Sequence, residues 1–211
     1  MGDFNQDSIR YIAITPSGAF FATLNSTPDD ARAMLLQLLS TDFELLYSLE
    51  LVSELADLDE VQAMGLFQQL LDRGFVCLTE TLPEIKRGPL EDTLPDLLMQ
   101  LSDSGKALLA DDQGFCLSST GYPSEQAETL AALAADLISL QERHQKVITN
   151  DLELAGDSWG IMNAAGQSQV GFWVVHIGHQ RFSLVISDMP RLNQQAFAEL
   201  LSCLARRYLD Y

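Results

Sequence analysis

The chain has 211 residues, of which 47% are hydrophobic and 20% charged, a composition typical of a globular protein that buries a core. Its 30 acidic residues outnumber its 12 basic ones, so the formal net charge is −18. This charge repels nucleic-acid phosphates and anionic membrane surfaces, because binding to either depends on Lys and Arg. We therefore expect no nucleic-acid partner. We also expect no membrane insertion, since no apolar run approaches the roughly 20 residues of a membrane helix.

The N-terminus and the cysteines indicate a cytoplasmic protein. The first seven residues are acidic and polar and lack the basic start and apolar centre of a signal peptide. Cys77, Cys116 and Cys203 are odd in number and far apart in the sequence. We expect them to be buried thiols in a reducing compartment, without a disulfide framework.

The first elements along the chain are a predicted β-hairpin and a helix. Residues 10–15 and 19–24 are rich in β-branched and aromatic side chains, and Pro16-Ser17-Gly18 between them is a turn signal. A helix is expected next, because Thr27 can cap it and Pro28 suits its first position.

Apolar residues at helical spacing predict two further helices, around residues 44–55 and from Asp57 to Gly74, followed by a strand at 75–79. Three helices and a strand resemble a winged-helix domain, so residues 1–82 are predicted to form a small winged-helix-like α+β module. A DNA-binding regulator is therefore an alternative function. It is disfavoured because residues 41–60 hold seven acidic residues and no basic one, where phosphate contacts need bases. A module used for protein contacts or as a structural cap is the favoured interpretation.

Residues 83–89 contain two prolines and a glycine and form the predicted linker to a second domain at 90–211. This domain is expected to begin with a helix to residue 101 and a hairpin whose polar turn is Asp111-Asp112-Gln113-Gly114. Ser124 is expected to cap a long helix. Three strands and a last helix complete the expected order, at about residues 159–163, 169–177, 180–187 and 193–208.

This order of elements is similar to that of the roadblock / dynein light-chain family, a relative of profilin- and longin-like folds. Three segments carry the resemblance: ALLADDQGFCLSSTG (107–121), AETLAALAADLISL (127–140) and RFSLVIS (181–187). The resemblance covers about residues 90–211. It implies an α+β domain with a five-stranded antiparallel sheet and flanking helices.

The resemblance also implies a homodimer formed through residues 124–145 and 158–163. Family members commonly bind or regulate small Ras-like GTPases or act as scaffolds in signalling and motility, and they are not usually enzymes. Small side chains on the long helix would let a partner helix approach, while Trp159 is expected to be either an interface anchor or an ordinary core residue. The candidate dimer contacts are Ala127, Ala131, Ala134, Ile138, Trp159 and Ile161.

The residues suggest no catalytic, cofactor-binding or metal site. His176 and His179 are the only close histidine pair, and on a strand they are expected to point to opposite faces, which suits shared metal ligation poorly. The sequence contains no phosphate-binding loop motif of the GxxxxGK[ST] or GxGxxG type. We therefore expect a non-catalytic protein without a cofactor, and a small-molecule sensor is a further alternative.

Overall fold

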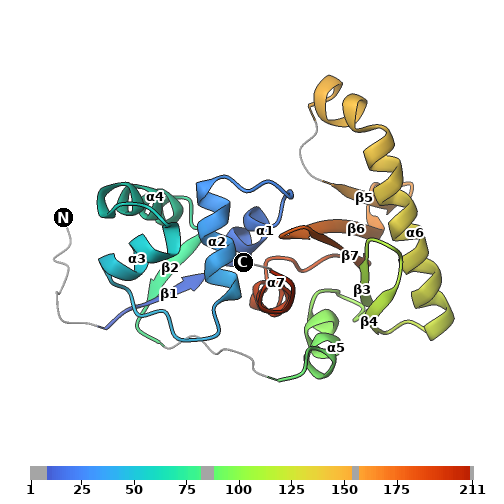
Figure 1. The fold of residues 1–211 in the computed structure, drawn as a ribbon. Coiled ribbons are helices and arrows are strands. Elements are labelled where there is room, and N and C mark those ends of the chain that lie inside the picture. Colours follow the sequence, from blue (N-terminus) through green and yellow to red (C-terminus); the bar gives the residue numbers. More distant parts are fainter. Residues whose placement is uncertain (1–8, 82–87, 154–156, 210–211) are drawn as a thin grey trace.

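The computed structural model describes residues 9–81, 88–153 and 157–209. Figure 1 shows an N-terminal module on one side and a sheet domain with a long outer helix on the other. The elements of the module are β1 (Tyr11–Ile14), α1 (Pro16–Ala22), α2 (Asp30–Ser40), α3 (Leu49–Ala56), α4 (Glu60–Asp72) and β2 (Val76–Thr79). The elements of the sheet domain are α5 (Leu90–Gln100), β3 (Ala107–Asp111), β4 (Cys116–Thr120), α6 (Ser124–Arg143), η1 (Lys146–Asp151), β5 (Ser158–Met162), β6 (Ser168–Ile177), β7 (Gln180–Ser187) and α7 (Gln195–Tyr208).

The predicted N-terminal hairpin is wrong, because its second strand is the helix α1. Thr15 caps α1 by accepting a hydrogen bond from the Gly18 N–H at 3.1 Å, and Pro16 occupies the first helical position. β1 pairs instead with the distant strand β2, in the antiparallel register that sets Ile14 opposite Val76. The module therefore has one helix more than expected. Its winged-helix character stays a prediction.

Two predicted helix caps are also displaced. The side chain of Asp29, rather than Thr27, caps α2 by accepting from the Arg32 N–H at 2.9 Å. Ser124 is the first residue of α6 rather than its cap, and Pro123 precedes it without a side-chain capping bond. The helix stop at Gly74 is confirmed, since this residue follows the α4 cap with a φ of +68°.

The predicted five-stranded antiparallel sheet is confirmed, with the strand order β4-β3-β7-β6-β5. Its first hairpin turns as the sequence predicts. The carboxylate of Asp111 accepts from the N–H groups of Gln113 and Phe115 at 3.0 and 2.8 Å, and Gly114 has a φ of +88°. The antiparallel order places β4 and β5 at the two edges of the sheet, on either side of the three central strands.

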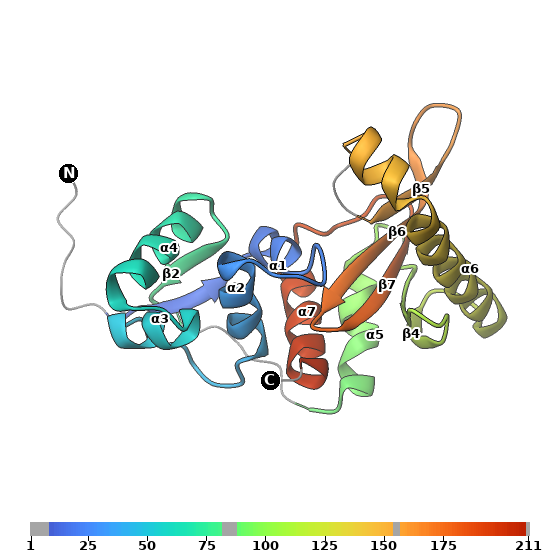
Figure 2. The ribbon, with the colours of Figure 1, turned by 45° about the horizontal axis from the view of Figure 1, so that its top comes forward.

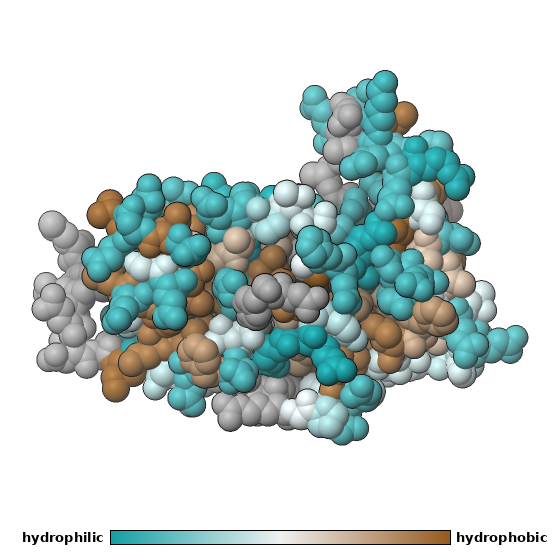
Figure 3. All heavy atoms as spheres, viewed as in Figure 1, coloured by the Kyte–Doolittle hydropathy of each residue, from teal (hydrophilic) through white to brown (hydrophobic). Residues whose placement is uncertain are grey.

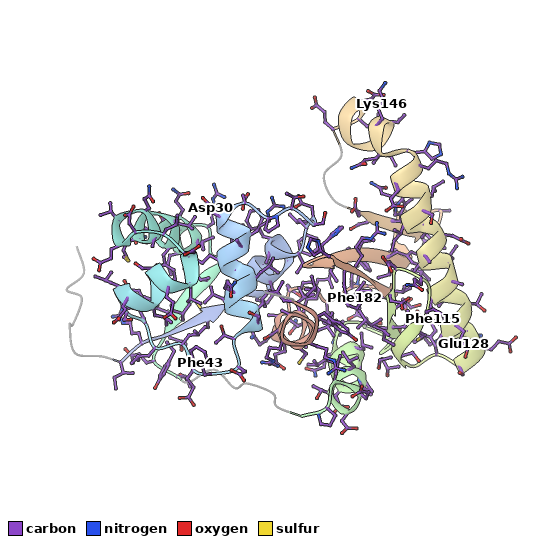
Figure 4. The ribbon with its side chains drawn as sticks, in the orientation of Figure 1. Asp30, Phe43, Phe115, Glu128, Lys146 and Phe182 are labelled. Carbon is purple, nitrogen blue, oxygen red and sulfur yellow. The ribbon has the colours of Figure 1, made fainter. Side chains whose placement is uncertain are left out.

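Helices cover both faces of the sheet (Figure 2). α6 packs on one face, over a small apolar cluster that includes Leu108, Phe172 and Val185. α5 and α7 cover the other face, where Phe182 and Leu184 point into the main core, and Figure 4 shows Phe182 in the interior beside α7.

The main core continues from the sheet domain into the N-terminal module. α7 packs on α2 and α1, the rings of Phe20 and Phe197 lie 6.2 Å apart, and the Ser202 hydroxyl donates to the Leu39 carbonyl at 2.7 Å. The His176 N–H donates to the Thr23 carbonyl at 2.9 Å, which ties β6 to the end of α1. The division at residues 83–89 stays a prediction, and residues 82–87 lie outside the described part. Among the described helices, none is long and apolar enough to cross a membrane.

Candidate protein-interaction surface

The inner face of α6 is buried against the sheet of the same chain. Four of the six candidate dimer contacts lie on this face with at most 5% of their surface exposed, and they pack on the sheet: Ala127, Ala131, Ala134 and Ile138. The small side chains let the sheet approach closely, because a Cβ on Gly114 would lie 3.1 Å from the Cα of Ala132. These four residues can meet another molecule only if α6 leaves the sheet. Within the chain they hold α6 against the sheet, and their role as dimer contacts stays a prediction.

The outer face of α6 carries the apolar groups that another protein could reach. Leu133 is 38% exposed, and Leu140 is partly exposed, while Leu130 and Leu137 are partly exposed and also pack against the cluster beneath α6. These four leucines follow each other at spacings of three and four residues, which places them along one side of the helix. We name this row the outer leucine row.

The edge strand β5 lies near the Leu137 end of this row, because Leu137 and Trp159 line the same small cavity. β5 pairs with β6, with Trp159 opposite Phe172 and Ile161 opposite Val170. Its other edge has no partner strand in the described part of the chain, and Ile161 and Met162 are 49% and 61% exposed. An unpaired edge presents free N–H and C=O groups that can pair with another chain. The exposed side chains of β5 and the leucines of the outer leucine row provide apolar groups near an unpaired strand edge.

Trp159 links β5 to α6. Its ring is half-buried against the apolar cluster under α6, so the core interpretation of this residue holds within the chain. Its indole Nε1 is buried and has no hydrogen-bond partner among the described residues. A cavity of about 20 Å³ beside it is lined by Leu137, Gln141 and Asp157, among others, and is large enough for one water molecule. A water or an acceptor from another chain would satisfy the N–H group, whose burial alone costs free energy.

A polar network under the end of α6 was not predicted from the sequence. His176 lies buried on β6, and its Nε2 is 3.2 Å from the carboxylate of Asp157. The same carboxylate accepts from the Gln141 side chain at 3.2 Å. The one signal in the sequence is Gln141 itself, a polar residue in the apolar stripe of the long helix. His179 lies exposed at the β6–β7 turn, and within the described ranges no cluster of three or more His, Cys, Asp or Glu side chains could hold a metal ion.

Arg181 fastens α6 to the sheet near this network. Its guanidinium pairs with Glu142 on α6 and with Asp112 in the β3–β4 turn, the latter at 3.3 Å. Partial burial lowers the pKa of Arg181, but the hydrogen bond and the charge of Glu142 outweigh burial, so the pKa is raised overall. The side chain therefore stays charged and acts as a structural clamp.

The three cysteines occupy different environments. Cys203 is buried and Cys116 half-buried, but Cys77 is exposed, which corrects the expectation that all three are buried. Cys77 follows Val76, whose side chain faces the core, and successive strand residues point to opposite faces. Burial raises the pKa of the Cys116 thiol. It therefore remains protonated at neutral pH and is a weak nucleophile.

The DNA-binding alternative rests on the helix α4, which would be the recognition helix. α4 begins after its cap Asp59 and carries Glu60 in its first turn and Asp72 in its last turn. Val61, also in the first turn, is 83% exposed. This face offers carboxylates where contacts to DNA need basic groups.

Comparison with known proteins gives the same resemblance as the sequence pattern. No protein-family profile matches the chain, and no curated protein sequence matches it. Several solved structures are similar to it, and two of them are described next. The roadblock/LC7 domain from Streptomyces avermitilis is 18% identical, with a TM-score of 0.40 over 58% of this chain and 98% of that one. The gliding protein MglB from Thermus thermophilus is 19% identical, with a TM-score of 0.37 over 59% of this chain and 93% of that one.

The chain resembles roadblock proteins. Its own sheet is antiparallel and five-stranded with helices on both faces, the architecture that the sequence resemblance implies. The N-terminal module joins the sheet domain through the packing of α1 and α2 on α7.

Proposed function

We propose that this protein is a non-catalytic interaction module that forms a homodimer and regulates or scaffolds a small Ras-like GTPase or an associated signalling complex. The observation that carries the homodimer is the surface made by the outer leucine row and the open edge of β5. Two copies related by a two-fold axis could pair their β5 edges and pack their α6 helices, because a two-fold contact uses the same patch on both chains. The GTPase partner comes from the roadblock resemblance noted in the sequence.

Changes on the outer surface test the homodimer without disturbing the core. Leu133→Asp and Ile161→Asp place a charge on exposed positions of α6 and β5, where burial of an unpaired carboxylate in an interface is costly. Light scattering after size-exclusion chromatography should give a dimer mass for the wild type and a monomer mass for both variants. Val61→Asp is the matched control, since Val61 is 83% exposed and lies on α4 in the other module.

The dimer proposal fails if the wild type is monomeric at micromolar concentration. It also fails if Leu133→Asp and Ile161→Asp both keep the dimer mass, as the control Val61→Asp is expected to do. Ala131→Glu is unsuitable as a dimer test. Ala131 is fully buried against the sheet, so this change would disturb folding whether or not a dimer exists.

Affinity capture from native lysate tests the GTPase. The lysate is divided, one half is supplemented with GDP and the other with a non-hydrolysable GTP analogue, and the tagged protein is used as bait. A small GTPase enriched in one half would support a regulator and identify the nucleotide state that it recognises. The same proteins in both halves, without a GTPase, would refute the GTPase partner and leave a scaffold.

A further inference from the structure

A groove lies where the N-terminal module meets α7. Figure 1 shows that these elements lie far from α6. The groove has a cavity volume of about 100 Å³, and its walls come from β1, the segment after α2, and α7. The apolar part includes Ile12, Ile14, Phe43 and Cys203. Phe43 is 56% exposed, and Figure 4 shows it on the N-terminal module, on the side away from α6. Figure 3 shows apolar side chains gathered over this module.

The backbone edge of β1 is half covered at this groove. The Ile12 N–H donates to the Leu45 carbonyl and the Tyr47 N–H to the Arg10 carbonyl, both at 2.8 Å, so residues 45–47 run antiparallel along the first half of β1. No bridge to β1 continues beyond Leu46 in this segment of the described chain. The second half of the β1 edge is therefore left to the groove.

Ile14 is the residue of β1 whose backbone N–H and C=O groups face the groove. The Thr15 N–H bonds to the Phe75 carbonyl, which makes Ile14 and Val76 a pair without mutual hydrogen bonds. In an antiparallel ladder the N–H and C=O of such a residue point away from the partner strand. Both groups of Ile14 thus point to the groove, and among the described residues no hydrogen bond of Ile14 on that side is found.

The charge around the groove is acidic. Glu44 is exposed and Glu199 half-exposed on its walls, against one base, Arg206. The segment that forms one wall continues into residues 41–60, which hold seven acidic residues and no basic one. The field at the groove mouth therefore favours positively charged groups.

We propose that this groove binds an extended, basic segment of a partner protein. The segment pairs as an added strand with the free edge at Ile14, places an apolar side chain against Phe43 and Cys203, and sets a Lys or Arg beside Glu44. Strand addition of this kind draws affinity from main-chain bonds and specificity from alternate side chains. The site does not depend on the homodimer, because its residues are separate from the outer leucine row and β5.

The test uses the full-length protein and a displayed library of random peptides of about twelve residues, with the recovered peptides resynthesised and measured by fluorescence polarisation. The recovered peptides should share an apolar residue next to Lys or Arg and contain no proline at the pairing positions. Their affinity should fall as salt concentration rises, since exposed charge pairs are screened. Slower hydrogen exchange of the Ile14 amide on binding would place the peptide at the β1 edge.

Two variants separate the backbone and side-chain contributions. Ile14→Pro removes the outward N–H while leaving the bonds to β2, as proline is tolerated on edge strands, and should weaken binding about tenfold. Ile14→Val keeps the N–H and is its control. Phe43→Ala should weaken binding by a similar factor of about ten, and Val61→Ala, outside the groove, should leave it unchanged.

The proposal is overturned if the library yields no enriched peptide, or if enriched peptides bind Phe43→Ala as tightly as the wild type. It is also overturned if Ile14 exchange is unchanged on binding. If Ile14→Pro proves unfolded by circular dichroism, Phe43→Ala and the exchange measurement still decide. Peptides enriched in Asp and Glu would refute the basic character of the partner.

Discussion

Gly171 offers the most direct test of the sheet, because a tryptophan ring occupies the place of its missing side chain. Gly171 lies buried on β6, and a Cβ built on it would meet three ring atoms of Trp173 at 2.1, 2.5 and 2.9 Å. A Cβ atom essentially never lies that close to a nonbonded heavy atom, so Gly171→Ala must displace the indole. The φ of Gly171 does not lie in the left-handed region, so strain would come from the ring and not from the backbone.

The expected loss follows from two opposing effects. Forcing an extra carbon into a packed site costs about 1–3 kcal/mol. Replacing glycine by alanine also restricts the unfolded chain, which stabilises the fold by about 0.4–1 kcal/mol. The net result should be a loss of about 1–2 kcal/mol in the free energy of unfolding, or a drop of about 2–8 °C in melting temperature for a chain of this length.

Gly160 provides a matched control in the neighbouring strand. It is the cross-strand partner of Gly171, yet the nearest atom to its built Cβ is the Val170 carbonyl oxygen at 4.0 Å. Gly160→Ala should therefore keep or slightly raise stability. Urea unfolding should be followed by far-UV circular dichroism, because tryptophan fluorescence would respond to the ring itself.

Two results would refute this reasoning. The first is equal stability of Gly171→Ala and Gly160→Ala. The second is an undiminished loss for Gly171→Ala when Trp173 has been replaced by leucine. In the double-mutant cycle we expect a coupling of about 1 kcal/mol or more between positions 171 and 173, since the two residues are in direct contact.

Three further predictions concern other parts of the chain. Gly18→Ala should cost about 3 kcal/mol in urea unfolding, because its Cβ would lie 2.0 Å from the Phe75 carbonyl oxygen, whereas Gly65→Ala on the open side of α4 should stabilise by about 1 kcal/mol. The pKa of Asp29 is lowered, chiefly by the backbone hydrogen bond at the start of α2, so its charged form stabilises the fold above the unfolded pKa near 3.8. The stability lead of the wild type over Asp29→Asn should therefore be present at neutral pH and shrink as the pH falls through the lower folded value, as measured by urea unfolding across pH. Arg181→Gln should lose at most about 1 kcal/mol, and a salt series should show the loss shrinking, because its ion pairs are partly exposed.

The sheet domain could be predicted from sequence because its signals are local. Asp111 and Gly114 fix the first hairpin by side-chain bonds and a positive φ within four residues. In β7, Phe182 and Leu184 point to one core and Val185 to the other. This alternation follows from the two-residue period of a strand, which can be recognised in the sequence.

The prediction of an N-terminal hairpin was wrong because the contacts that determine the structure are distant in the sequence. Residues 19–24 are aromatic and β-branched enough for a strand, yet α1 forms since Thr15 both caps it and donates to the Gly74 carbonyl at 2.7 Å. The third residue of α1, Gly18, then approaches the Phe75 backbone too closely for any side chain. Contacts with residues about 60 positions away thus determine the conformation. Strand propensity over a few neighbouring residues cannot include such contacts.

The burial of four candidate interface residues within the chain could not be predicted, for a different reason. A row of alanines on a helix indicates that some backbone comes close, but it does not say which one. Here it is the chain's own sheet and the turn at Gly114, so Ala131 and Ala134 face inward. The periodicity identified the helix correctly and left the identity of its partner open.

The N-terminal module explains why the two proposed surfaces lie at opposite ends of the molecule. α7 is enclosed between the sheet on one side and α1 and α2 on the other, so it offers no broad free face. α6 has the sheet on one side, and Leu133 of the outer leucine row is exposed in the described chain. The module packs on α7 and not on α6 or β5, and at its junction with α7 it forms a separate groove. A mutation at Leu133 should therefore change the oligomer without affecting peptide binding, and a mutation at Phe43 should do the reverse.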